Sequence, residues 1–242
     1  MDKIVIDIWV YLAASPLLWL TLTLIVYLAA RWLFQRSGGR ALLNPVALAI
    51  TVLVTLLLLT NTPYPTYFTG TQFIHFLLGP ATVALAIPLY LHWEQVRQLL
   101  LPIIVGLLSG SLTAILSAIG IAWLLGGSPR ILLSLAPKSV TTPVAMGIAE
   151  KIGGLPSLTA VLVILTGVLG AIAAPTLLSW LRIRNEATKG LAIGVAAHGI
   201  GTARAFQISA LAGAFSGLAI GLNALLTALL VPLIVHLLHL TP

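Results

Sequence analysis

The sequence predicts an all-α polytopic membrane protein, and two observations carry that prediction. Only 7% of the 242 residues are charged and 60% are hydrophobic, whereas an ordinary soluble domain has about 25% charged residues. Uncharged stretches also recur along the chain, at residues 8–30, 41–93, 98–129, 152–181 and 205–242. So little charge excludes a soluble enzyme, and so much hydrophobicity excludes a disordered chain. The length suits seven or eight apolar segments of about 20 residues each.

The expected segments follow the uncharged stretches in order, separated by breaks that contain Gly, Pro or basic residues. They are residues 8–33, 43–60, 71–91, 100–125, 131–149, 157–181, 188–208 and 212–238. We interpret the first as a span and not a secretion signal, because acidic residues flank Lys3. The break NTPYPTYFTG at 61–70 is expected to be an aromatic loop at the membrane interface. Residues 1–242 are expected to form a single integral membrane domain, in which 1–40 hold the first span and a basic loop.

Basic loops predict the orientation and point to one unusual segment. Loops 31–40 and 182–189 each carry three Lys or Arg residues, which are enriched on the cytoplasmic side of membrane proteins. Five segments lie between these loops, so both can be cytoplasmic only if one segment does not cross. Residues 131–149 are the best candidate for a broken or re-entrant segment, because two prolines and a lysine interrupt them. If all five segments cross, the loop-charge rule is violated instead.

An internal similarity suggests a repeated architecture. Residues 106–116 and 163–173 are displaced by 57 positions and share five identities. These are Leu108/Leu165, Gly110/Gly167, Leu112/Leu169, Ala114/Ala171 and Ile115/Ile172. If the repeat is real, each copy is an interrupted segment followed by a long helix rich in small residues, as in transporters that bind substrate at interrupted helices. The alternative is chance similarity between apolar helices.

The first block with chemical potential is APKSVTTPVAMGIAEKIGG at 136–154. Pro137 suits the first turn of a helix. Pro143 would interrupt the helix, and broken backbone at membrane depth is tolerated only inside the protein or along a cavity. Lys138, the neighbouring hydroxyls and a helix N-terminus would suit a carboxylate. Those hydroxyls belong to Ser139, Thr141 and Thr142. The alternative is an interfacial Lys138 beside hydroxyls that bond to their own helix.

The second block is AAHGIGTARA at 196–205, where His198 and Arg204 lie in an apolar stretch. A charge near the bilayer centre costs about 2.5–3.5 kcal/mol, so an intramembrane Arg is a functional candidate. Arg204 could grip a carboxylate through two hydrogen bonds, Thr202 adds a hydroxyl, and His198 suits proton coupling. The positions that permit a break or a close approach are Gly199 and Gly201. The alternative is an Arg that extends to the interface and a His that packs between helices.

The third block, LLGPATVALAIPL at 77–89, has no charge. Gly79 and Pro80 would break a helix there, and Thr82 offers a hydroxyl to the predicted substrate site. The alternative is a kinked packing helix. Asn223 is interpreted as a buried amide that holds helices together. We expect no enzyme activity, cofactor or metal, because no catalytic or metal-binding constellation is present, and no nucleic-acid partner, because the basic residues form no stripe.

These blocks, taken in order, resemble the LrgB family, which includes CidB- and YohK-like proteins. The similarity rests on GPATVALAIPL, LAPKSVTTPVAMGIAEKIGG, PSLTAVLVILTGVLGAIAAP, AAHGIGTARA and GAFSGLAIGLNALLTALL, and it covers about residues 44–235. The resemblance implies an LrgB-like region within 41–242 and a multi-pass protein of the bacterial cytoplasmic (inner) membrane.

The resemblance also implies a partner and two contrasting functions. LrgB-like proteins pair with a small LrgA- or CidA-like, holin-like membrane protein. One function is antiholin-like regulation of murein hydrolase activity and autolysis. The other is transport, because the plastidal glycolate/glycerate translocator looks like an LrgA–LrgB fusion and some bacterial pairs are associated with pyruvate uptake.

Intramembrane positive charge favours transport over regulation. We therefore predict an oligomeric carrier that works with its partner in the lipid bilayer and moves a small organic anion: glycolate, glycerate, pyruvate or lactate. Lys138 and Arg204 are predicted to face one cavity near mid-membrane, where a carboxylate would relieve their mutual repulsion.

Overall fold

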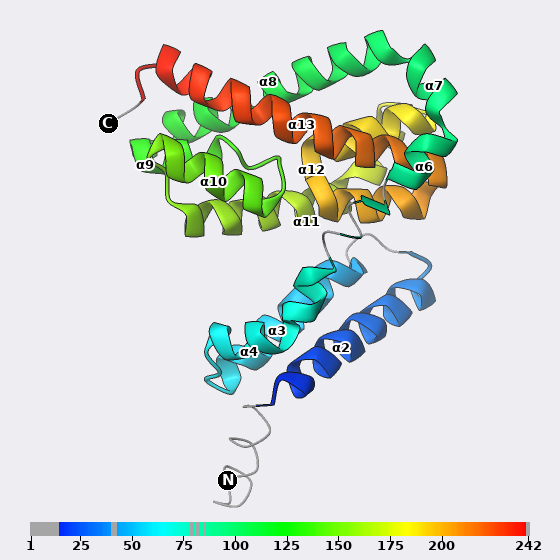
Figure 1. Cartoon of the computed structure of the whole chain (residues 1–242), viewed down its shortest axis with the longest axis vertical. Helices are drawn as coiled ribbons and strands as arrows, with labels where there is room; N and C mark the ends of the chain where they lie inside the picture. Colours follow the sequence, from blue (N-terminus) through cyan, green and yellow to red (C-terminus); the bar gives the residue numbers. More distant parts are fainter. Residues whose placement is uncertain (1–14, 40–42, 78–79, 81–82, 85, 241–242) are drawn as a thin grey trace, which may run out of the picture. The chain divides into compact units, whose positions relative to one another are not determined.

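The computed structural model describes residues 15–39, 43–77, 80, 83–84 and 86–240, and all regular elements in these residues are helices. The chain forms two compact units, unit 1 (Met1–Ala84) and unit 2 (Leu85–Pro242) (Figure 1). Four helices are long and apolar enough to cross a membrane: α2 (Pro16–Arg36), α8 (Leu100–Leu124), α11 (Pro156–Trp180) and α13 (Ala210–Leu237). The chain is therefore an all-α membrane protein, while the predicted total of seven or eight segments is not confirmed.

In unit 1, α2 packs against both α3 (Pro45–Leu59) and α4 (Tyr64–Phe76). Trp19 of α2 is fully buried. Its ring meets the ring of Tyr67 edge-on, with 5.8 Å between the ring centroids. An aromatic contact of this geometry adds to the apolar burial that joins α2 to α4.

The prediction of an aromatic loop at 61–70 was wrong, because the chain is helical from Tyr64 onward. Pro65 lies in the first turn of α4, where a missing N–H costs no helical hydrogen bond. Tyr64 stacks on Phe68 one turn later. The prolines of this segment therefore start a helix, and the aromatic residues line one side of it.

Unit 2 contains three long helices separated by two helical hairpins. In chain order, its elements are α6 (Ala86–Leu91), α7 (Trp93–Gln98), α8, α9 (Pro129–Leu135), α10 (Thr142–Ile152), α11, α12 (Glu186–Ile208) and α13. Hairpin 1 is residues 129–152 and hairpin 2 is residues 186–208. The core lies where both hairpins pack against the long helices.

Two faces of unit 2 follow from which helix ends share apolar clusters. Val96, Ile103, Ala187 and Phe215 pack together, which gathers α7 and the first residues of α8, α12 and α13 at what we call the α7 face. Ile119, Ile152 and Val235 pack together. They gather the last residues of α8, α10 and α13 at what we call the α9 face.

Hairpin 1 enters from the α9 face and returns to it. The Ser134 hydroxyl near the end of α9 accepts a hydrogen bond from the Leu155 backbone N–H at 2.8 Å. Thr159 at the start of α11 donates to the Ser134 carbonyl at 3.0 Å. The chain therefore comes back beside α9 once α10 has ended, so segment 131–149 is broken into two short helices. That the segment is re-entrant in the membrane stays a prediction.

The two prolines of hairpin 1 exchange their predicted roles. Pro137 was expected in the first turn of a helix, but it lies in the turn that follows α9, which ends at Leu135. Its ring would clash with the carbonyl four residues earlier and it has no N–H to donate, so the helix stops. Pro143 lies in the first turn of α10 and starts that helix instead of interrupting one.

Hairpin 2 lies in segment 188–208, where Gly199 and Gly201 were predicted to permit a break. His198 has φ 41° and ψ −137°, which reverses the chain inside α12. A Cβ built on Gly201 would lie 2.8 Å from Cγ2 of Ile193, although residues eight apart on one continuous helix are separated by about 12 Å. The two halves of α12 therefore run antiparallel, and the segment both enters and leaves at the α7 face.

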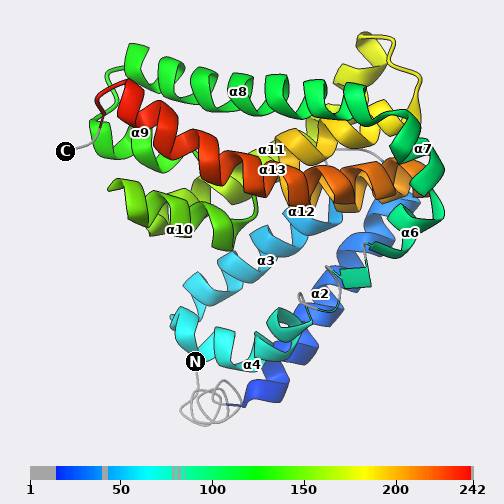
Figure 2. The ribbon, with the colours of Figure 1, turned by 45° about the horizontal axis from the view of Figure 1, so that its top comes forward.

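The hairpins thus enter unit 2 from opposite faces (Figures 1 and 2). Each follows a helix of 25 residues, α8 or α11, and these two helices start 56 positions apart. This spacing supports the internal repeat found near offset 57, with the second copy inverted relative to the first. Hairpin 1 also directly precedes α11, which is the predicted order of an interrupted segment followed by a long helix. The repeat itself stays a prediction.

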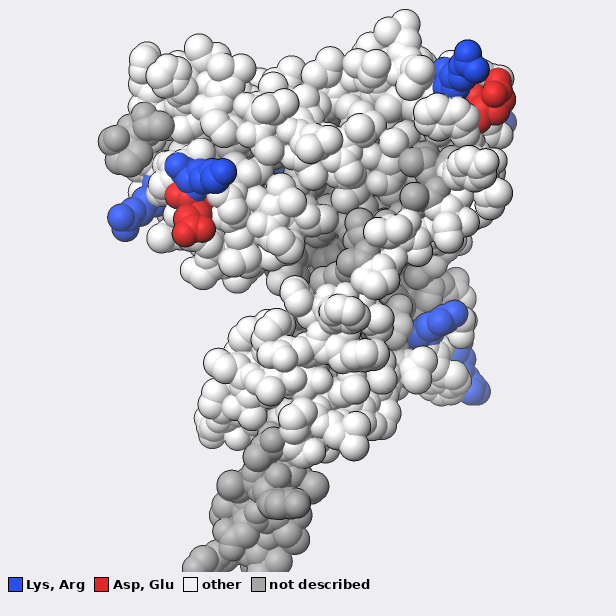
Figure 3. Space-filling model, viewed as in Figure 1, with Lys and Arg blue, Asp and Glu red and all other residues white. Residues whose placement is uncertain are grey.

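Charge follows the same division of unit 2. On the side seen in Figure 3, nearly all charged atoms of unit 2 gather at its two ends, and the surface between them carries almost no charge. The long apolar helices α8, α11 and α13 run through the region between these charged ends. The tips of both hairpins bond to the middle of α13, between these two ends.

Candidate functional site

The tips of the two hairpins meet at one side chain, Asn223, in the middle of α13. We call this meeting point of Ser139, Val195 and Asn223 the crossing. Its amide nitrogen Nδ2 donates to the carbonyl of Ser139 in hairpin 1 and to the carbonyl of Val195 in hairpin 2, both at 3.2 Å. Its oxygen Oδ1 accepts from the hydroxyl of Ser111 in α8 at 2.5 Å and from that of Thr227 at 3.4 Å. One buried amide therefore links both breaks to α8 and α13.

The two breaks explain why an amide is placed there. Interrupting a helix frees backbone carbonyls, and a buried carbonyl without a hydrogen bond costs about 1–3 kcal/mol. The two N–H groups of Asn223 satisfy one carbonyl at each break. The reverse orientation of the amide would aim its oxygen at both carbonyls, so the hydrogen-bond network fixes which atom is nitrogen.

The positive ends of two half-helices also point toward the tips. α10 begins at Thr142, next to the break, and no side chain caps it. The second half of α12 begins after His198. The N-terminus of a helix carries partial positive charge and unpaired N–H groups. The C-terminal ends of α9 and of the first half of α12 meet there as well, and one carbonyl at each break bonds to Asn223.

Lys138 adds a full positive charge at this crossing. Its side chain is half-buried, and Nζ lies 3.4 Å from the hydroxyl of Ser139. Lys138 and Ser139 therefore lie side by side in hairpin 1. A shared binding role for these two residues and His198 stays a prediction.

His198 and Thr202 fasten hairpin 2 to its neighbours. Nε2 of His198 is 2.9 Å from the carbonyl of Val163 in α11. Thr202 bonds to the hydroxyl of Ser216 in α13 at 2.7 Å and donates to the His198 carbonyl at 3.0 Å. Gly167 makes room for the imidazole, because a Cβ there would lie 2.6 Å from Cε1 of His198. These polar groups stabilise the chain reversal.

Arg204 lies nearer the α7 face than the crossing does. Its guanidinium donates to the side chain of Gln207 at 2.7 Å. Its neighbours in the second half of α12 reach Ser216 and Gly213 of α13, and Gly213 is about 15 Å along the helix from Asn223. The cavity shared by Lys138 and Arg204 stays a prediction.

Comparison with known proteins decides the family. The LrgB-like family matches residues 23–237. The chain belongs to the LrgB family. Among its relatives, Bacillus subtilis YwbG is 42% identical over 201 residues, covering 83% of this chain and 89% of YwbG. Antiholin-like protein LrgB of Bacillus cereus strain B4264 is 30% identical over 206 residues, covering 85% of this chain and 90% of that protein. No solved structure matches the chain.

The remaining residues predicted for a site in this LrgB-family chain fall into three groups. Thr141 and Thr142 lie at the start of α10, beside the crossing. Gly201 allows a close approach, since a Cβ there would lie 2.6 Å from the Cβ of Ala197, whereas Gly199 faces open space. Pro80 is exposed. Gly79 and Thr82 lie outside the described residues.

Three hydroxyls at or near the crossing were not identified from the sequence. They are Ser111, Ser216 and Thr227. Each is a buried hydroxyl within a long apolar helix, and that pattern was the available signal. A lone Ser or Thr can bond to its own helix backbone, however, so a partner on another helix could not be assigned from the sequence.

Proposed function

We propose that this LrgB-family chain carries small monocarboxylates of the glycolate, glycerate, pyruvate or lactate type across the bacterial cytoplasmic (inner) membrane. We propose further that it acts with an LrgA- or CidA-like partner, and that it moves its substrate without chemical conversion. The supporting observation is the crossing, where hairpins from opposite faces meet beside Lys138. Transporters with inverted repeats bind substrate at such discontinuous helices.

The polarity of the crossing favours an anion. In transporters, carbonyls freed by unwinding coordinate cations, while half-helix N-termini hold anionic groups. Here the N–H groups of Asn223 occupy a carbonyl at each break, and α10 points its uncapped N-terminus at the same region. Lys138 supplies the full charge that one carboxylate would balance.

Loop charges support an orientation for the carrier. The α7 face carries four basic residues, Arg97, Arg182, Arg184 and Lys189. The α9 face carries Arg130 and Lys151. Because Lys and Arg are enriched in cytoplasmic loops, the α7 face is assigned to the cytoplasm.

A second candidate function comes from a relative's name. The Bacillus cereus relative is called antiholin-like, which favours a regulator of murein hydrolase activity and autolysis that transports nothing. Such a regulator needs no substrate-dependent role for Lys138, so flux through the purified protein separates the two functions.

The test is uptake of labelled monocarboxylates into proteoliposomes that contain the chain with and without its LrgA-like partner. Lys138→Gln should lower uptake by more than about tenfold, because a charge-assisted hydrogen bond contributes about 1.5–3 kcal/mol. Lys151→Gln is the matched control, since Lys151 is an exposed lysine at the end of the same hairpin, and it should transport normally.

Flux of one or more monocarboxylates that depends on Lys138 supports the carrier. Equal flux through the Lys138 and Lys151 variants would show that the crossing is not the substrate site. No specific flux under any gradient, with or without the partner, would leave the regulator as the function.

A further inference from the structure

A second polar feature lies at the α7 face, away from the crossing. A cavity of about 440 Å³ opens between the end of α11 and the two ends of hairpin 2. Leu178 and Ser179 of α11 form one wall, and Lys189 and Ile208, from the two limbs of α12, lie across from them. The cavity exists because hairpin 2 returns to the face that it entered.

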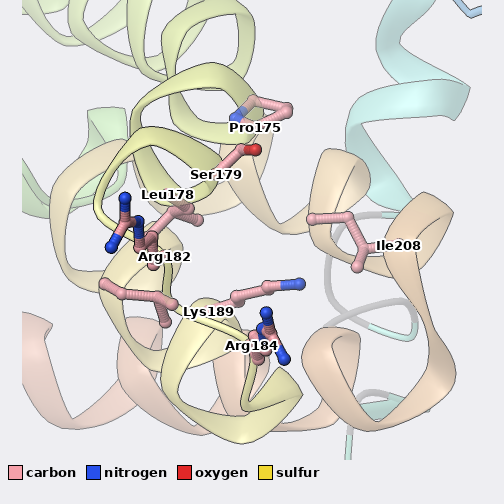
Figure 4. Close-up of a pocket in the computed structure, with 8 residues that line it drawn as sticks. Pro175, Leu178, Ser179, Arg182, Arg184, Lys189 and Ile208 are labelled. Atoms are coloured by element: carbon pink, nitrogen blue, oxygen red, sulfur yellow. The ribbon is translucent and has the colours of Figure 1, made fainter.

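Three cations line this cavity, and no acidic residue does. They are Arg182, Arg184 and Lys189. Within the described chain, none of them forms an ion pair with a carboxylate. In Figure 4 the side chains of Arg184 and Lys189 end near one another, while Arg182 is directed to the opposite side of Leu178. Like charges gathered without a counterion repel one another and attract an anion.

The backbone at Arg182 gives an independent reason to assign a role to that side chain. Arg182 has φ 57°, in the left-handed region, and its N–H bonds to the Ser179 carbonyl while the Ile183 N–H bonds to the Leu178 carbonyl. This is the helix-ending geometry that usually takes Gly. A bulky cation is strained there, and strain of this kind clusters at ligand sites.

We propose that this cavity binds a phosphate-class oxyanion. Arginine offers planar paired donors that match phosphate oxygens, lysine offers a point charge, and the Ser179 hydroxyl can donate a further hydrogen bond. Arg184 and Lys189 hold the anion, and Arg182 swings in as a third contact. A monocarboxylate, with one charge, balances three cations less completely than a phosphate does, so the site differs from the crossing and does not depend on the proposed transport.

Phosphate of this kind has two sources, the headgroup of an anionic phospholipid and a soluble phosphate compound. The experiment uses the full chain purified in a neutral detergent and follows its thermal unfolding. One arm adds inorganic phosphate against potassium chloride at equal ionic strength. The other adds phosphatidylglycerol against phosphatidylcholine at equal amounts.

Variants decide whether any stabilisation arises at the cavity. In Arg184→Gln/Lys189→Gln, the concentration of phosphate or phosphatidylglycerol needed for half-maximal stabilisation should rise by at least about tenfold per lost contact. Arg182→Gly should raise this concentration less, because Arg182 is directed away from the other two cations. Gly suits the left-handed backbone, so this variant should fold. Arg130→Gln, an exposed arginine at the α9 face, is the matched control and should respond like the wild type.

Stabilisation by inorganic phosphate identifies a soluble ligand, and stabilisation by phosphatidylglycerol alone identifies a lipid headgroup; either result supports the site if the double variant loses it. If the double variant does not fold, the single variants Arg184→Gln and Lys189→Gln replace it. Each should lose part of the stabilisation by phosphate or phosphatidylglycerol. Equal responses from wild type, cavity variants and Arg130→Gln would overturn the proposal, as would a chloride effect as large as that of phosphate.

Discussion

At Asn223, four segments of the chain exchange hydrogen bonds through one side chain. The amide serves Ser139 and Val195 as a donor and Ser111 as a hydrogen-bond acceptor. In a lipid environment, irregular backbone is tolerated only where its polar groups find partners within the protein. The breaks in both hairpins therefore depend on a residue that belongs to neither of them.

Replacing Asn223 with Ala should lower the free energy of unfolding by about 2–4 kcal/mol, because two buried carbonyls and two hydroxyls lose this partner. Thermal unfolding in detergent measures the loss. Asn44→Ala is the matched control, since Asn44 only caps α3 through two backbone N–H groups and its loss costs about 1 kcal/mol. Equal losses in the two variants would contradict a central role for Asn223.

Residue types could be singled out from the sequence, but their partners could not. Lys138 and His198 stood out because charged or titratable groups are rare in apolar segments, and the structure shows their partners, the Ser139 hydroxyl and the Val163 carbonyl. The bond from Asn223 to Ser139 joins residues 84 positions apart. Such a contact depends on how the helices pack, which no local pattern encodes.

Among the elements, hairpin 2 depends on close packing against α13. A Cβ on Gly194 would lie 2.5 Å from the backbone carbonyl oxygen of Ser216, whereas one on Gly199 would meet no atom within 4 Å. Gly194→Ala should therefore lower the free energy of unfolding by about 1–3 kcal/mol through overpacking.

Gly199→Ala is the control for that prediction. It should leave stability unchanged or raise it by up to about 1 kcal/mol, because Ala favours helix more than Gly does. Both variants are compared by thermal unfolding in the same detergent. A similar loss at the two positions would mean that hairpin 2 does not pack on α13 as described.

The two hairpins differ in how well the sequence predicted them. Pro137 and Pro143 mark hairpin 1, because proline ends or starts a helix wherever it lies. Hairpin 2 has no proline, and its reversal occurs at His198, a residue type that helices accept. Gly199 and Gly201 were predicted to permit a break, but contacts with Val163 and Ser216 select the reversal at His198, and these contacts depend on packing.

For the whole molecule, the inverted arrangement gives each face one hairpin that reaches the crossing. Hairpin 1 comes from the α9 face and hairpin 2 from the α7 face, and both end on Asn223. In the proposed carrier, a shift of either hairpin would open the crossing toward its own face, as alternating access requires.

The sequence has no cysteine, so single cysteines can map the topology of the chain without further changes. We expect Arg184→Cys and Gln207→Cys, at the two ends of hairpin 2, to react with a membrane-impermeant maleimide from the same side in sealed vesicles. Arg130→Cys and Lys151→Cys, at the two ends of hairpin 1, should react together from the opposite side. All four residues are exposed.

Labelling of 184 and 207 from opposite sides would mean that α12 crosses the membrane and that its reversal at His198 is wrong. Labelling of 130 and 151 from opposite sides would remove hairpin 1 in the same way. A fifth position, Arg36→Cys, tests the loop-charge argument. With hairpin 1 re-entrant, four of the five segments between the basic loops remain to cross, so Arg36→Cys should react from the same side as Arg184→Cys.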